Sequence, residues 1–107
     1  MDILINIDEL QESDGLFYQR SSNTPFSGGV TGKEKGTFND GKREGHWVTF
    51  YDNGQLRNEG NHSKGEREGP WVFYYENGQL GCEVAYQNGE KEGLEVAYHE
   101  NGQLREK

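Results

Sequence analysis

One segment of this chain recurs three times at a fixed spacing of 24 residues, and this repeat constrains the fold more than any other feature. The central copy, Gly65–Leu80, reads GEREGPWVFYYENGQL. Residues 41–56 read GKREGHWVTFYDNGQL and residues 89–104 read GEKEGLEVAYHENGQL, with no insertion between the copies. A fixed period of this length indicates a repeat array in which each unit packs on its neighbours.

An Asn-Gly pair near the end of each copy predicts a β-hairpin. A two-residue type I′ turn needs positive φ at both central positions, which Asn tolerates and Gly prefers. The residues before each pair are rich in strand formers. We therefore expect three hairpin turns, at Asn53–Gly54, Asn77–Gly78 and Asn101–Gly102.

Counting outward from a two-residue turn predicts which residues face each other across a hairpin. In the second unit all six side chains of the predicted pairs share one face, because strand side chains alternate. These pairs are Tyr75–Leu80, Phe73–Cys82 and Trp71–Val84. The opposite face is expected to mix aliphatic and aromatic residues with charges. It carries Val48, Phe50, Val72, Tyr74, Val96 and Tyr98, with the partners Arg57, Glu59, Gly81, Glu83, Arg105 and Lys107.

The glycine-flanked tripeptide that opens each copy predicts the turn that joins one hairpin to the next. In the central copy this tripeptide is Glu66–Glu68, between Gly65 and Gly69, and we expect it to form a solvated tip. Asp40–Gly41 is expected to form the first turn of the array. The third unit carries Glu95 where the others carry Trp, which is typical of a terminal, capping repeat with a more polar face.

These patterns predict an all-β protein, an elongated antiparallel meander of β-hairpin repeats that forms an open single sheet. We expect a single domain over residues 1–107. Residues 1–37 are predicted to supply N-terminal strands and a degenerate repeat that caps the array, and residues 38–107 the three repeats. Only 30% of the residues are hydrophobic, so we expect stability to come from stacked neighbours rather than from a thick core.

The repeat resembles the variant MORN repeat common in bacterial proteins, which combines a glycine-rich turn, an aromatic strand and Asn-Gly-Gln-Leu. This resemblance covers Phe38–Leu104. Upstream, GLFY at Gly15–Tyr18 and TPFSG at Thr24–Gly28 are similar to the lead-in of YwqK-family antitoxins. The resemblance implies a hairpin-repeat fold, and it implies a protein that neutralises a toxin by binding it.

The net charge of −8 bears on the partners of this chain. Binding to nucleic acid and to anionic membranes is dominated by Lys and Arg, so we expect neither nucleic-acid binding nor membrane insertion. An acidic surface favours basic partners, although the same charge also serves simply to keep an exposed sheet soluble. Cys82 is alone and residues 1–6 lack the features of a signal peptide, so we expect a cytoplasmic protein.

No group of residues in the sequence predicts catalysis, a metal site or a cofactor. The spacing of His46, His62 and His99 matches no metal-site pattern. Cys82 has no identifiable basic helper, and the glycines match no phosphate-binding loop. We therefore expect a protein that is not an enzyme and that binds no cofactor or metal.

Acidic and aromatic residues that recur at the repeat period are the candidates for contact with a partner. Glu44, Glu68 and Glu92 occupy one position of the repeat, where they form either an acidic binding stripe or merely solvated tips. Trp47 aligns with Trp71 and is expected either to lie in the core or to serve as an exposed anchor, because Trp is enriched among interface hot spots.

Two functions remain open at this point. The first is an antitoxin or immunity protein that blocks a basic toxin domain by direct binding. The second is a general MORN-repeat scaffold or adaptor without a toxin partner. A toxin gene beside the gene for this chain would favour the first.

Overall fold

The computed structural model describes residues 4–99, 101 and 103–106, apart from the side chains of residues 93–95 and 104–106. Most of the chain forms one nine-stranded sheet in the order β1-β4-β5-β6-β7-β8-β9-β10-β11, and β2 pairs with β3 beside it. The strands are β1 (Leu4–Asn6), β2 (Leu10–Ser13), β3 (Leu16–Gln19), β4 (Gly28–Thr31), β5 (Glu34–Asn39), β6 (Lys42–Phe50), β7 (Leu56–Ser63), β8 (Glu66–Tyr74), β9 (Leu80–Gln87), β10 (Glu90–Tyr98) and β11 (Leu104–Glu106), and a short 3-10 helix, η1, spans Ile7–Glu9.

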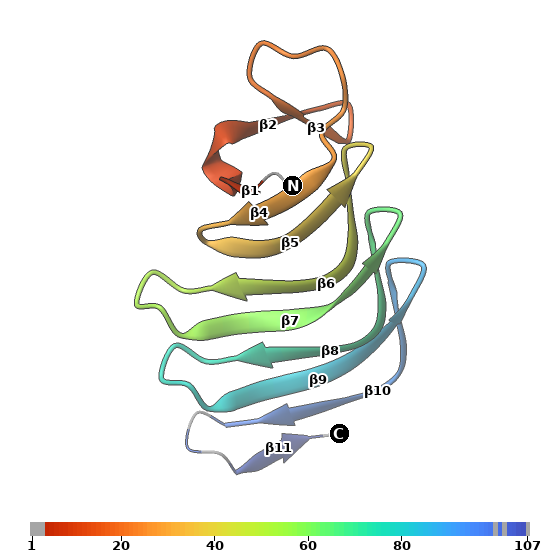
Figure 1. Cartoon of the computed structure of the whole chain (residues 1–107). Helices are drawn as coiled ribbons and strands as arrows, with labels where there is room; N and C mark the ends of the chain where they lie inside the picture. Colours follow the sequence, from red (N-terminus) through yellow and green to blue (C-terminus); the bar gives the residue numbers. More distant parts are fainter. Residues whose placement is uncertain (1–3, 100, 102, 107) are drawn as a thin grey trace.

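The main sheet is an open meander of successive hairpins. From β4 onward each strand pairs antiparallel with the next, so the chain runs back and forth along one axis (Figure 1). The molecule is elongated, with extents of 47 × 30 × 25 Å. The predicted all-β array of hairpin repeats is therefore confirmed, with the β2–β3 hairpin as an addition outside the single sheet.

The N-terminal segment closes one end of the array. The β4–β5 hairpin joins the main sheet ahead of the three regular units, and β1 pairs in parallel with β4. The β2–β3 hairpin is held at the first turn of the array, where the Phe17 N–H donates to Gly41 O at 2.9 Å and the Gly41 N–H donates to Phe26 O at 2.7 Å. Phe26 is buried, and its ring lies 6.0 Å from that of Phe38.

The turns that join one hairpin to the next are two-residue turns with positive φ at both positions, as a type I′ turn requires. They lie at Asp40–Gly41, Lys64–Gly65 and Asn88–Gly89. The prediction of a solvated tip between Gly65 and Gly69 was wrong, because two residues suffice for the turn. Glu66–Glu68 therefore belongs to β8 and pairs with β7. Gly69, with φ of 79°, lies at an irregularity in the β7–β8 register.

The Asn-Gly turns differ from the predicted two-residue type I′ geometry. Gly78 has φ of 90°, but Asn77 is not at positive φ. The Gly78 N–H donates to Tyr75 O, and the Tyr75 N–H donates to Gln79 O, both at 2.9 Å. This pattern defines a three-residue loop, a type I turn followed by a left-handed glycine. The side chain of Asn77 explains the difference, because its Oδ1 accepts the Gln79 N–H at 2.9 Å.

The longer loop shifts the register next to the turn and leaves it unchanged further along the strands. Phe73 pairs with Cys82 and Trp71 with Val84, as predicted, whereas Tyr74 takes the place of Tyr75 opposite Leu80. The first unit has the same geometry, with Gly54 at φ of 88° and Asn53 Oδ1 accepting the Gln55 N–H at 2.8 Å. In the third unit Asn101 Oδ1 accepts the Gln103 N–H at 3.0 Å. Gly102 lies outside the described residues.

Gly78→Val is expected to lower the free energy of unfolding by about 1–2 kcal/mol, because a β-branched residue is strained at positive φ. The measurement is a urea melt of the variant beside the parent chain. Gln79→Val, at the next and equally exposed position, is the control and should cost much less. Equal losses for the two variants would contradict the role of the left-handed glycine.

The core is built from tryptophan rings that cover glycines of the neighbouring strand. A Cβ atom added to Gly60 would lie 2.2 Å from the Trp71 ring, and one added to Gly36 would lie 2.3 Å from the Trp47 ring. Each indole Nε1–H also donates to a backbone carbonyl of the strand that it covers. The third unit carries Val84 at the position of the glycine and Glu95 at that of the indole. The side chain of Glu95, predicted to be exposed, lies outside the described part.

Candidate binding surface

The recurring acids Glu44 and Glu68 form hydrogen bonds that join neighbouring units. Glu44 Oε1 accepts the Lys64 N–H of the next turn at 2.9 Å, and Glu68 Oε1 accepts the Asn88 N–H at the same distance. Both side chains are partly buried, whereas Glu92, at the same repeat position, is exposed. The structure therefore gives two of the three predicted partner-binding acids a structural role in the turns and leaves Glu92 open to solvent.

Trp47 is a core residue and not an exposed anchor. It is 1% exposed, and its ring lies edge-on to Phe38 at 5.1 Å and to His62 at 6.0 Å between centroids. Of the two roles considered for Trp47, the structure supports the core role. The exposed-anchor role does not fit the structure, because Phe38, His62 and the Arg43 guanidinium, 5.0 Å from the ring centroid, cover the indole.

A second set of contacts between units lies at the Asn-Gly end of the hairpins. Tyr51 Oη donates to Tyr74 O and Tyr75 Oη donates to Tyr98 O, both at 2.6 Å. The third unit carries the exposed His99 at this position. The recurring tyrosines thus hold each hairpin to the following one.

Two partly buried arginines lie over the aromatic core, although the sequence placed them in solvated tips. Arg43 lies 5.0 Å from the Trp47 ring and forms an ion pair with Glu34 at 3.1 Å. Arg67 lies 4.8 Å from the Trp71 ring and donates to Tyr86 Oη at 3.1 Å. Each arginine lies four residues before a Trp in the sequence, and this recurrence was the signal that could have predicted the contact. Such cation–π contacts cover the indole rings and keep the charge in contact with solvent.

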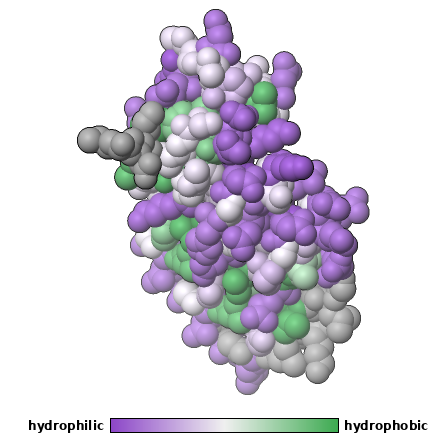
Figure 2. Space-filling view, turned by 45° about the vertical axis from the view of Figure 1, so that its right-hand side comes forward, coloured by the Kyte–Doolittle hydropathy of each residue, from purple (hydrophilic) through white to green (hydrophobic). Residues whose placement is uncertain are grey.

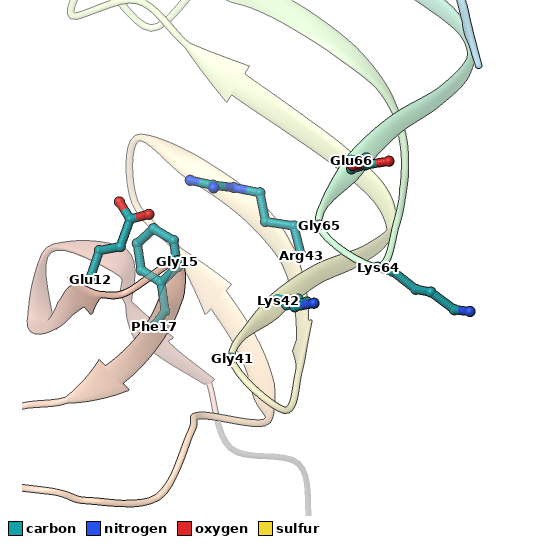
Figure 3. Close-up of a pocket in the computed structure, with 9 residues that line it drawn as sticks. All are labelled: Glu12, Gly15, Phe17, Gly41, Lys42, Arg43, Lys64, Gly65 and Glu66. Atoms are coloured by element: carbon teal, nitrogen blue, oxygen red, sulfur yellow. The ribbon is translucent and has the colours of Figure 1, made fainter. Parts of the chain in front are cut away.

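A small cleft lies between the β2–β3 hairpin and the first two turns of the array. Its volume is about 190 Å³, and Figure 3 shows Arg43 reaching toward Phe17 and Glu12, whereas Lys64 points away. The charge of Arg43 is already matched by Glu34. We therefore do not regard this cleft as the functional site.

His62 lies in the aromatic core between the two tryptophans. Its ring centroid is 5.0 Å from that of Trp71 and 6.0 Å from that of Trp47, and its Nδ1 is buried without a hydrogen-bond partner. Burial lowers the pKa of His62 from 6.5 to about 4, and the charges of Arg43 and Arg67 add to this effect. The imidazole is therefore neutral in the folded protein at neutral pH.

The low pKa of His62 predicts that the protein loses stability as the pH falls. The unfolded chain takes up a proton near pH 6.5 and the folded chain only near pH 4, so the free energy of unfolding decreases between these values. Because His62 is only partly buried, solvent screening reduces the expected loss to about 1–2 kcal/mol. His62→Tyr copies Tyr86 at the same repeat position and should remove this part of the pH dependence in urea melts. Identical pH profiles for the two proteins would contradict the prediction.

The face opposite the tryptophans is open and carries a continuous row of alternating valines and glutamates. The row crosses six strands in register, with the order Lys35, Val48, Glu59, Val72, Glu83 and Val96. We call the five residues from Val48 to Val96 in this row the outer face. Its three valines are partly buried, and Glu83 is exposed. Figure 2 shows one side of the molecule, where hydrophobic patches interrupt the hydrophilic surface over the lower part of the array.

Other kinds of site are not evident in the described part of the chain. There, no group of three or more His, Cys, Asp or Glu side chains is arranged to hold a metal ion. The partly buried side chain of Cys82 packs against the core opposite Phe73. Among the described residues, no helix has the length and apolar character needed to cross a membrane.

A stack of hairpins with one closed core face and one open face defines a repeat protein of the scaffold or binding class. The chain belongs to the family described as MORN repeat variant, which matches residues 43–64, 67–88 and 91–107. No curated protein and no solved structure matches the chain.

Proposed function

We propose that this protein is an antitoxin or immunity protein that neutralises a basic toxin domain by binding it directly in the cytoplasm. The observation that carries the proposal is a broad, open sheet face on a small repeat protein with a net charge of −8. Repeat proteins commonly use such extended surfaces for protein partners. The similarity of Gly15–Tyr18 and Thr24–Gly28 to the lead-in of bacterial YwqK-family antitoxins points in the same direction.

The proposal treats the protein as a binding partner and not as an enzyme. The acids and aromatics that recur at the repeat period mostly hold the units together, as Glu44 and Tyr51 do. Residues used in this way contribute to the shape of the surface and supply no reactive group. The acidic surface would steer a cationic toxin domain toward the sheet and speed the encounter.

The test is co-expression with a toxin domain encoded by a neighbouring gene, whose presence the proposal requires, followed by measurement of the association rate against ionic strength. We expect rescue of growth and an association rate that falls as salt rises. Glu92→Gln should slow association, because this exposed carboxylate can be neutralised without disturbing a turn, whereas Glu44→Gln also weakens a turn contact. A rate indifferent to salt would exclude electrostatic steering.

Failure of growth rescue would favour the second function, a general MORN-repeat scaffold or adaptor without a toxin partner. This alternative rests on the family itself, whose repeats provide surface for assembly. It predicts a stable complex with a protein that has no toxic activity.

A further inference from the structure

Among the described residues, the two faces of the main sheet differ in what they offer to a partner. The inner face is closed, because Trp47 and Trp71 are 1% and 2% exposed. On the outer face, Val72 pairs across strands with both Glu59 and Glu83, so apolar and acidic side chains alternate along the array. Because neighbouring strands lie about 4.8 Å apart, the two carboxylates recur about every 10 Å along the array axis.

The two carboxylates of the outer face differ in whether the chain itself provides a nitrogen partner. Glu59 Oε2 lies 3.1 Å from His46 Nε2 on the neighbouring strand. In the next unit the position equivalent to His46 is Pro70, which has no charge to offer. In the described part of the chain, the Glu83 carboxylate accordingly has no ion pair or hydrogen bond, and it is exposed between Val72 and Val96.

Among the side chains that the structure describes, two cations of this face lie beside the first unit. Lys35 Nζ lies 5.6 Å from the Phe50 ring centroid, and the Arg57 guanidinium lies 5.5 Å from that of Tyr51. Both rings belong to the first unit, whereas Glu83 belongs to the second. Among the described side chains, the Glu83 carboxylate therefore lies on β9, away from these two cations.

We infer that the outer face around Glu83 is the docking surface, and that its occupant is a basic segment of a protein partner. A lysine or arginine of that segment pairs with the Glu83 carboxylate, and flanking apolar side chains cover Val72 and Val96. The contact of His46 Nε2 with Glu59 shows, within this chain, how a nitrogen donor meets the same carboxylate position. The inference rests on the proposed function and adds the surface and the partner chemistry to it.

The five valines of the chain provide the readout, because three lie on the outer face and two, Val30 and Val84, are buried in the core. The full chain, labelled at valine methyl groups, is titrated in NMR with the peptide acetyl-Lys-Leu-Lys-Leu-Lys-Leu-amide. We expect the methyl signals of Val72 and Val96 to shift most and those of the two core valines to stay in place. The matched acidic peptide, with Glu for Lys, should cause no shift.

Two variants with the same change of charge decide whether Glu83 is responsible. Glu83→Lys should weaken binding of the basic peptide by at least about tenfold, because like charges then meet. Glu90→Lys, at an exposed position beside the Asn88–Gly89 turn, should change it less than about twofold. Pro70→His should weaken binding moderately below pH 6, because it gives Glu83 a partner like His46.

Several results would overturn the inference. These are the absence of shifts at millimolar peptide, equal shifts at core and outer valines, and equal effects of the two lysine variants. The outcome is separable from that of the proposed function. If Glu83→Lys rescues growth as well as the parent chain does, the docking surface is excluded and the antitoxin role stands. If the parent chain binds the peptide but does not rescue growth, the antitoxin role is excluded and the docking surface stands.

Discussion

Trp71→Ala is expected to lower the free energy of unfolding by about 3–5 kcal/mol, the range for removal of a large buried aromatic ring. Trp71 is 2% exposed, its Nε1–H donates to Asn61 O at 2.9 Å, and its ring contacts His62 at 5.0 Å between centroids. Because the indole covers β7 from β8, its loss leaves a cavity at the junction of two units.

Urea and thermal melts of Trp71→Ala provide the measurement, with Trp71→Phe as a graded control that keeps an aromatic ring and loses the hydrogen bond. We expect Trp71→Phe to lose less stability than Trp71→Ala. A loss below about 1 kcal/mol for Trp71→Ala would show that the site collapses without a cavity and that the array does not depend on this ring.

Gly60→Val is expected to cost about 3 kcal/mol in the parent chain, because the added Cβ lies 2.2 Å from the Trp71 ring and the indole must move. Gly60 is not at positive φ, so the cost arises from packing and not from backbone strain. In the third unit the equivalent position is Val84, and the equivalent of the indole is glutamate. Valine at this position is therefore compatible with the fold once the ring is absent.

The same substitution in the Trp71→Ala background should cost little or even restore stability, because the valine fills the space that the indole leaves. A double-mutant cycle should therefore give a coupling energy of about 2 kcal/mol between positions 60 and 71. Asn58→Val, on the same strand and face, is the control and should show no comparable coupling. Additive effects at positions 60 and 71 would contradict the tryptophan-over-glycine contact.

The elements of this fold followed from patterns within single units. The 24-residue period, the strand-forming segments and the pairing of Trp71 with Val84 could all be predicted, because hydrophobic alternation and turn residues act locally. The family followed from the same residues. Near the turn the prediction of register was wrong by one residue, since the Asn77 side chain bonds to its own backbone and lengthens the loop.

The roles of the recurring residues were decided by contacts between units, which no single unit reveals. Glu44 looked like a surface group in the sequence, yet it accepts a hydrogen bond from a turn 20 residues away. The sequence left Trp47 either in the core or as an exposed anchor, and the structure shows it 1% exposed. The availability of a carboxylate on the outer face likewise depends on a residue of the neighbouring strand. His46 contacts Glu59, whereas its counterpart Pro70 offers no partner to Glu83. Sequence periodicity determines which residues recur. The stacking of one hairpin on the next determines which of them form contacts between units and which remain open to a partner.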